Sequence, residues 1–237
     1  MSARDQIMGS IRTALKRGPL DAMRTAELDA KLELPARNLI PKRAASLDAS
    51  GRIALFVAMA EEVQTTVTRV HSAAEVPGVV ADYLAERNLP AQLVVTPDPQ
   101  LDPIPWDLRP LLEIRRGRAE DGDLSGVTGC FAAVAETGTL MLISGPQSPT
   151  RNNFLPDNHI VVLRAEQVVA SYEDGIDRLR LAARGSDGTW SMPRTVNYVT
   201  GPSRTGDIEQ KIELGAHGPR RLHIVLIDGE SGDPDKG

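Results

Sequence analysis

The stretch TVNYVTGPSRTGDIEQKIELGAHGPRRLHIVLID, residues 195–228, holds the strongest local structural signals in the chain. Residues 196–199 are rich in β-formers and predict a strand. Ile208 and Ile212 lie four residues apart, which predicts a short helix with one apolar face. Residues 222–227 form an apolar run that is typical of a buried strand. We therefore expect a strand, a polar glycine-rich loop, a short helix and a second strand.

The loop between the first strand and the expected helix is polar and begins with glycine. Its candidate ligand-binding residues are Gly201, Ser203, Arg204, Thr205 and Asp207. Backbone N–H groups at a helix start are unpaired and lie at the positive end of the helix dipole, so this loop predicts a site for phosphate or carboxylate. A second interpretation stays open, in which Asp207 only caps the helix, Gly215 ends it and Arg204 is solvated.

Two histidines differ in their surroundings. His217 lies in a glycine-bracketed turn after the expected helix, close to a strand edge, where a side chain can approach a ligand. We include His217 among the candidate ligand-binding residues. His159 instead opens the apolar run at residues 159–163, where a structural role is the better interpretation.

The segment TGPSRTGDIEQ, residues 200–210, followed by LGAHGPRRLHIVLID, residues 214–228, resembles the signature of the LUD-domain family, of the lactate-utilisation protein C type. The resemblance implies an α/β fold, a three-layer sandwich with a mainly parallel sheet, similar to the phosphosugar-isomerase and CoA-transferase superfamily. It also implies a role in the bacterial oxidation of L-lactate to pyruvate, together with two iron-sulfur partner proteins.

A second block, GVTGCFAAVAETGTLMLIS at residues 126–144, also resembles this family. Family members have a similar run of small residues that ends in an acidic residue, threonine, glycine and a hydroxyl residue. The matching residues here are Glu136, Thr137, Gly138 and Thr139. A strand-end glutamate is the nucleophile in the related CoA-transferase fold, and by this analogy Glu136 is the catalytic candidate.

The chemistry of this block supports either a site or a turn. Glycine lets the backbone approach a ligand, and threonine hydroxyls can donate to an anion, so Thr128, Thr137, Gly138 and Thr139 are candidate ligand-binding residues. The carboxylate of Glu136 can act as a base or a nucleophile. Alternatively, Glu136 and Gly138 form only a tight reversal between two strands.

Composition excludes several classes of partner. The chain has 237 residues, is 41% hydrophobic and has a formal net charge of -5, which argues against a nucleic-acid-binding protein. No run reaches the length of a membrane-spanning helix, and residues 1–20 are charged with no apolar secretory core. We therefore expect a cytoplasmic protein with an anionic small molecule as ligand, and neither nucleic acid nor membrane as partner.

The cysteine count limits the redox chemistry that the chain can perform. Cys130 is the only cysteine, and one thiol cannot ligate an iron-sulfur cluster. No flavin or nicotinamide fingerprint and no metal-ligand set is evident, so we assign the chain no cofactor and no metal. Cys130 lies among small and apolar residues, which favours a buried structural role.

The rest of the chain alternates between helical and extended patterns. Residues 53–67, 73–87 and 172–183 predict helices, whereas residues 68–71 and 93–96 predict strands. Such alternation is typical of βαβ units with a mainly parallel sheet and helices on both faces. We divide the chain into a helical N-terminal arm at 1–50, an α/β domain at 51–228 and a disordered tail at 229–237.

These patterns lead to one structural and several functional expectations. Residues 126–138 and 200–207 should lie at neighbouring strand ends and face one crevice. The chain is expected to act in L-lactate oxidation. The alternatives are an enzyme with phosphosugar-isomerase, CoA-transferase or folate cyclo-ligase-like chemistry, or a non-enzymatic module that binds an anionic metabolite.

Overall fold

The computed structural model describes residues 2–16, 18–33, 35, 37, 42–185, 187, 189–208 and 211–229, with backbone alone over 206–208 and 211–213. The chain divides into two compact units, Met1–Leu39 and Ile40–Gly237. The predicted disordered tail lies outside the described residues, apart from Gly229. The predicted boundary near residue 51 falls inside a helix that begins at Ala49, and the division into an arm and an α/β domain stays a prediction.

The first unit contains α1 (Ala3–Ala14) and α2 (Ala22–Glu33), where the sequence predicts helices. The Ser2 hydroxyl accepts a hydrogen bond from the backbone N–H of Asp5, and the Asp5 carboxylate accepts one from the backbone N–H of Ser2, so α1 begins with a capping box. Neither helix contains a buried residue.

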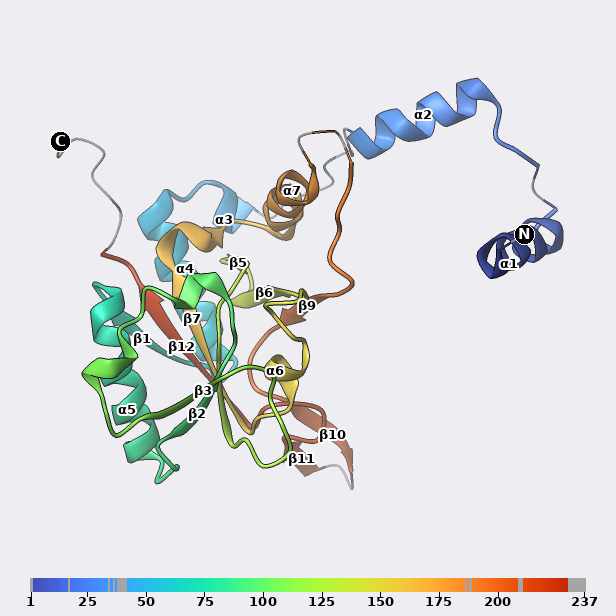
Figure 1. Ribbon diagram of the computed structural model, residues 1–237. Coiled ribbons are helices and arrows are strands. Elements are labelled where there is room, and N and C mark those ends of the chain that lie inside the picture. The colour runs from blue at the N-terminus through green and yellow to red at the C-terminus, as the bar shows by residue number, and fades with distance from the viewer. Residues whose placement is uncertain are drawn as a thin grey trace. The chain divides into compact units, whose positions relative to one another are not determined.

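The second unit is built on a six-stranded sheet in which every pair of neighbouring strands is parallel (Figure 1). The neighbouring interior strands β7 and β12 are buried almost throughout, as a sheet covered on both faces requires. In sheet order the strands are β1 (Thr66–Val70), β12 (Arg221–Ile227), β7 (Asn158–Arg164), β4 (Ser125–Thr128), β2 (Gln92–Val95) and β3 (Glu113–Arg116).

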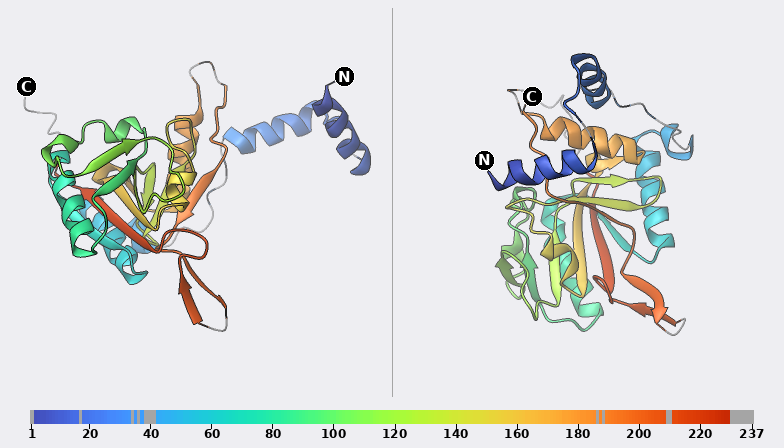
Figure 2. Two further views of the ribbon diagram at one scale, coloured as in Figure 1. Left: turned by 60° about the horizontal axis from the view of Figure 1, so that its bottom comes forward. Right: turned by 90° about the vertical axis from the view of Figure 1, so that its right-hand side faces the viewer.

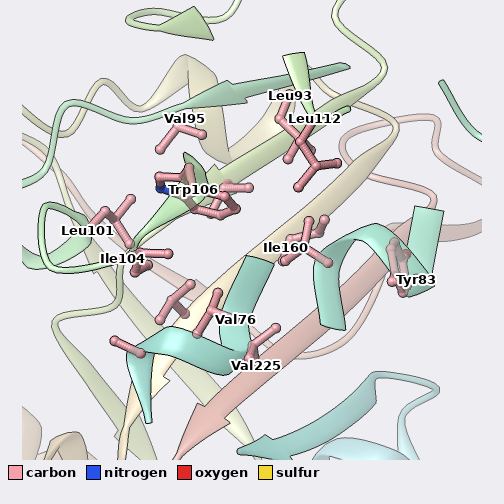
Figure 3. Close-up of a cluster of buried hydrophobic side chains, with 14 of the residues drawn as sticks. Val76, Tyr83, Leu93, Val95, Leu101, Ile104, Trp106, Leu112, Ile160 and Val225 are labelled. Atoms are coloured by element: carbon pink, nitrogen blue, oxygen red, sulfur yellow. The ribbon is translucent and has the colours of Figure 1, made fainter. Parts of the chain in front are cut away.

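One face of this sheet is covered by α5 (Val76–Glu86) together with 3-10 turns at Ala73–Glu75, Pro99–Leu101 and Trp106–Leu108. Figure 3 shows the resulting core, in which the Trp106 ring packs among side chains from the sheet and from α5. Burial of this ring holds the proline-rich loop at residues 98–110 on the sheet.

The other face is covered by α4 (Ala49–Glu62) and by a second sheet of four strands (Figure 2). In sheet order these are β8 (Val168–Val169), β5 (Ala132–Val134), β6 (Thr139–Ile143) and β9 (Val196–Val199). The predicted α/β fold, with a mainly parallel sheet and helices on both sides, is confirmed. The small sheet is an additional layer on one face.

The helix α7 (Tyr172–Ala183) packs on the outer face of the small sheet, where Leu179 contacts Ala132 and Met141. Its start matches the sequence prediction. The Ser171 hydroxyl accepts a hydrogen bond from the backbone N–H of Asp174, and the Asp174 carboxylate accepts one from the backbone N–H of Ser171.

The prediction of a helix at residues 207–214 is wrong. The chain forms an antiparallel hairpin of β10 (Arg204–Ile208) and β11 (Lys211–Leu214), which extends away from the two sheets in Figure 2. The backbone of Ser203 closes the base of the hairpin, because its carbonyl accepts from the N–H of Gly215 at 3.0 Å. Isoleucines four residues apart fit a helix face, but their β-branched side chains are also well suited to a strand.

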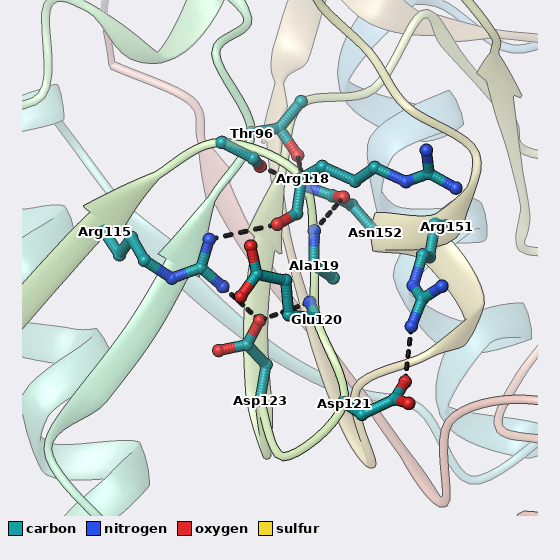
Figure 4. Close-up of polar contacts among 10 residues, drawn as sticks. Thr96, Arg115, Arg118, Ala119, Glu120, Asp121, Asp123, Arg151 and Asn152 are labelled. Carbon is teal, nitrogen blue, oxygen red and sulfur yellow. Dashed lines mark hydrogen bonds and ion pairs between the residues drawn. The ribbon is translucent and has the colours of Figure 1, made fainter.

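Two short helices complete the second unit, α3 (Lys42–Ala45) and α6 (Arg151–Phe154). The buried Asn152 side chain ties α6 to the loops after β2 and β3 (Figure 4). Its Nδ2 donates to the Thr96 hydroxyl at 3.0 Å and to the Gly117 carbonyl at 2.8 Å, and its Oδ1 accepts from the Ala119 N–H at 2.8 Å. These three bonds fix the strand-end loops in place.

None of the helices in the described part of the chain has the length and apolar character that a membrane crossing needs.

Candidate functional site

Four hydroxyl groups form a cluster where the two sequence motifs meet. The Thr139 Oγ1 lies 2.7 Å from Thr137 Oγ1, 3.0 Å from the Tyr172 hydroxyl and 2.7 Å from Thr200 Oγ1. Tyr172 also reaches Thr137 at 3.0 Å. The strands β6 and β9 are antiparallel neighbours, so the start of one lies beside the end of the other. At this point Thr139, which directly follows residues 126–138, lies beside Thr200. That residues 126–138 and 200–207 face one crevice stays a prediction.

Two glycines set the loops of this cluster against the C-terminal end of α4. Gly138 has φ +64, and a Cβ atom there would lie 2.4 Å from the Ala60 nitrogen. Gly201 has φ +80, and its Cβ would lie 2.6 Å from the Val63 carbonyl oxygen. Only glycine fits both the conformation and the space. These glycines thus allow a close approach to the backbone at the end of α4, where the sequence suggested a close approach to a ligand.

Glu136 lies in the turn between β5 and β6, as the turn interpretation predicts. Its backbone N–H donates to the Ala170 carbonyl at 3.2 Å, and its carbonyl accepts from the guanidinium of Arg43. Its side chain is half-buried and makes no hydrogen bond or ion pair within the described part of the chain. The Glu136 carboxylate is therefore available, and its catalytic role stays a prediction.

Ser203 and His217 form a separate group near the amino end of β12. The Ser203 hydroxyl accepts from the His217 backbone N–H at 3.2 Å, and the Ser203 N–H donates to the Pro219 carbonyl at 2.8 Å. The His217 side chain is exposed. These contacts close the loop at the base of the hairpin, and ligand binding by Ser203 and His217 stays a prediction.

The remaining residues of the predicted anion loop lie in β10. Arg204 is exposed, Thr205 is buried, and the Asp207 side chain lies outside the described residues. Because residues 204–214 form a hairpin, Asp207 caps no helix, and the helix-dipole argument for an anion site no longer applies. A ligand at Arg204 depends on the guanidinium alone.

Thr128 is engaged with a histidine in the core. Its hydroxyl lies 2.8 Å from His159 Nε2, and both residues are buried. Burial lowers the pKa of His159 from 6.5 to about 4, because the charged imidazolium loses its hydration. His159 is therefore a neutral core residue, in line with the structural interpretation.

A cavity of about 210 Å³ lies beside the segments that follow β2 and β4. In open α/β sheets, ligands bind at the carboxyl ends of the strands. The polar side chains that line it are those of Asp98, Gln100, Ser144, Gln147 and Ser148. This cavity is the best candidate functional site in the described part of the chain.

Asp98 supplies the titratable group of this cavity. Its Oδ1 accepts from the Gln100 N–H at 3.0 Å, and its Oδ2 lies 2.9 Å from where a Cβ would stand on Gly129. Burial raises the pKa of Asp98, since desolvation disfavours the carboxylate. The Gln100 side chain is held by Gln167 Nε2 at 2.6 Å. Such a carboxyl group is suited to exchanging a proton with a ligand.

The sequence analysis did not select Asp98. The available signal is its position, because Asp98 follows the buried strand predicted at 93–96 by two residues and stands between two prolines. Cys130 also lines the cavity. Burial raises the pKa of the Cys130 thiol to about 12, so the thiol stays protonated and structural.

Within the described residues, no group of three or more His, Cys, Asp or Glu side chains is arranged to hold a metal ion.

Comparison with known proteins places these features in a family context. Residues 53–227 match the family described as LUD domain. A protein named Lactate utilization protein C from Deinococcus radiodurans is 32% identical over 166 residues, which cover 66% of this chain and 70% of that protein. A protein of the same name from Bacillus subtilis is 29% identical over 110 residues, covering 46% of this chain and 44% of that protein.

A solved structure shares the fold. The crystal structure of a DUF162 family protein from Deinococcus radiodurans has a TM-score of 0.57 and 26% sequence identity, and the match covers 76% of this chain and 99% of that chain.

Proposed function

This chain belongs to the LUD-domain family, and from that membership we propose that it acts in lactate utilisation, as a subunit of a bacterial system that oxidises L-lactate to pyruvate with two iron-sulfur partner proteins. The observation that carries the proposal is the 166-residue similarity to a protein named Lactate utilization protein C. The family match, at residues 53–227, includes all strands of the six-stranded sheet and ends at the last residue of β12.

The cysteine content supports a division of labour between subunits. Oxidation of lactate releases electrons as well as protons, and electrons need a carrier. Cys130 is the only thiol in the chain, it is buried, and one thiol cannot ligate a cluster. Cluster ligands must therefore come from other chains.

The cavity beside Asp98 supports a role in proton handling. Removal of the hydroxyl proton of a 2-hydroxy acid needs a general base within hydrogen-bond reach. Asp98 faces the cavity, and burial shifts its pKa upward, towards the range in which a base exchanges protons efficiently. In the proposed system each lactate loses two protons and two electrons: Asp98 accepts the hydroxyl proton, the hydrogen on Cα leaves as the second proton, and the partner proteins accept the two electrons.

Growth of the source bacterium tests the proposal. Deletion of the gene should abolish growth on L-lactate and spare growth on pyruvate. Complementation with the parent chain should restore growth, whereas Asp98→Asn should not. Asp107→Asn, a change at an exposed acid in the same proline-rich segment, is the matched control and should restore growth fully. Normal growth of the deletion strain on L-lactate would overturn the proposal.

Affinity purification tests the partner assignment. A tagged chain purified from cells grown on L-lactate should recover two cysteine-rich proteins that contain iron and acid-labile sulfide. The isolated chain should show negligible lactate-dependent dye reduction until these proteins are added. Strong activity of the isolated chain would contradict the need for partners.

We also propose that the exposed Arg204 contributes to binding of the anionic small molecule, with Ser203 and His217 nearby at the base of the hairpin. Calorimetry with lactate, pyruvate and inorganic phosphate should show weaker binding in Arg204→Ala with the fold intact. Arg118→Ala, at another exposed arginine, is the control. Equal affinity in Arg204→Ala and the parent for every ligand that binds would remove Arg204 from the site.

A further inference from the structure

A second cavity, of about 530 Å³, lies between the C-terminal half of α7 and residues 191–194. Its volume falls in the range of small-molecule sites, which is roughly 300–1,000 Å³. Residues 143–146 contribute to its wall and also to the wall of the cavity beside Asp98. This second cavity is more than twice as large, and Asp98 does not line it.

The interior of this cavity is mainly apolar. Leu179 and Ala183 come from α7, Ile143 from the end of β6, and Met192 from residues 191–194. Leu179 and Ala183 are buried, whereas 53% of the Met192 surface is exposed. A large apolar side chain that stays exposed over an apolar cavity favours binding of an apolar group there.

The lining of the cavity also includes polar residues and one positive charge, that of Arg194. Arg194 is exposed and makes no hydrogen bond or ion pair with any residue that the structure describes. The Ser144 hydroxyl accepts a hydrogen bond from the Thr195 N–H at 2.9 Å, which leaves its own hydrogen free to donate. Ser191 also lines the cavity. These groups offer one positive charge and hydroxyl donors to a single anionic group.

We propose that this cavity binds an amphipathic monocarboxylate, with its apolar body against Leu179 and Met192 and its carboxylate at Arg194. One guanidinium matches one carboxylate in charge and in hydrogen-bond geometry. Lactate has a single methyl group to bury, so the ligand of this cavity differs in class from the substrate in the proposed function. The inference therefore stands independently of lactate oxidation.

Octanoate is the probe, with 1-octanol as its uncharged counterpart, and calorimetry on the full chain is the measurement. Octanoate should bind saturably and more tightly than 1-octanol. Arg194→Gln should weaken octanoate binding about tenfold, in line with the loss of one charge-assisted contact, and leave 1-octanol binding unchanged. Ala182→Leu, at an exposed position of α7 that lines the cavity, should weaken both ligands by filling the space.

Arg180→Gln is the matched control. Arg180 is on the same helix and lies over the Trp190 ring, but it does not line the cavity. This variant should bind octanoate like the parent chain. Absence of saturable octanoate binding, equal affinity in Arg194→Gln and the parent, or the same loss in Arg180→Gln as in Arg194→Gln would each overturn the proposal. Circular dichroism of all three variants verifies that the fold is intact.

Discussion

The Oγ1 atom of Thr139 lies 2.7 Å from the Oγ1 atom of Thr200, and this contact joins the start of β6 to the loop after β9. The two residues are 61 positions apart in the chain. Around them, Tyr172 connects the same cluster to the start of α7. Three elements of the small sheet layer are thereby tied together by side-chain hydroxyls.

The hydroxyl of Thr139 should contribute measurably to stability. Thr139 is fully buried, and its replacement by the similarly shaped valine leaves the hydroxyls of Thr137, Tyr172 and Thr200 short of a partner. We expect Thr139→Val to lower the free energy of unfolding by about 1–3 kcal/mol, measured by urea denaturation. Thr195→Val, at an exposed threonine, should change it by less than about 0.5 kcal/mol. Equal effects of the two substitutions would contradict a special role for the cluster.

Gly138 should be among the least replaceable residues. Alanine at this position suffers both from the positive φ and from a clash with the backbone of α4 at Ala60. The two effects together should lower the free energy of unfolding by about 3 kcal/mol, which corresponds to a fall in Tm of about 6–12 °C. The control is Gly145→Ala, where a Cβ meets no atom within 4 Å. Calorimetry measures the Tm of both variants. A Gly138→Ala protein with the Tm of the parent would contradict the prediction and would show that α4 can move away from residue 138.

Acid should destabilise the fold through two buried histidines. Burial lowers the pKa values of His159 and His223 from 6.5 to about 4. Between these pH values the unfolded chain binds protons that the folded chain does not, so stability present above pH 6.5 is lost as the pH falls towards 4. Each histidine should contribute a slope of up to about 1.4 kcal/mol per pH unit.

Variants separate this histidine effect from that of the carboxylates. His159→Gln should remove part of the slope in urea unfolding measured across this pH range. His71→Gln, whose parent side chain is 88% exposed, should keep the slope of the parent chain. An unchanged slope in His159→Gln would mean that His159 is protonated in the folded protein.

The carboxyl group of Asp98 should lower the stability of the folded chain at neutral pH, although the proposed function depends on it. Burial raises its pKa, so the folded chain holds the carboxyl proton to a higher pH than the unfolded chain does. Its contribution is therefore most favourable below the ordinary pKa of aspartate and is lost as the pH rises through the folded-state pKa. We expect Asp98→Asn to match or exceed the stability of the parent at neutral pH, and this advantage should shrink in acid. Urea unfolding at several pH values checks the sign, and a variant that is less stable only at neutral pH would contradict it.

Local signals were enough to predict most of the second unit. The helix at 172–183 has a serine cap and a spaced apolar face, and the strand at 222–227 is a continuous apolar run. The alternation of such elements predicted the parallel sheet. These signals depend on residues close together in the chain, so the sequence alone reveals them.

The hairpin at residues 204–214 shows where local signals fail. Ile208 and Ile212 satisfy the spacing of a helix and the composition of a strand at once. The outcome depended on contacts outside the segment, in which Ser203 bonds to Gly215 and to Pro219. Gly215, which the sequence predicts to end a helix, has φ +86 and instead follows a strand.

By itself, the sequence determined the parallel α/β fold and the family resemblance, because periodicity, caps and motif residues are local properties. Only the tertiary structure decided that Gly138 and Gly201 pack against α4 and that Thr128 pairs with His159. It also decided that Asp98 meets Gly129, since β2 and β4 are neighbours in the sheet although β3 lies between them in the chain. Strand order is set by packing across the whole domain, and no segment of the chain encodes it alone.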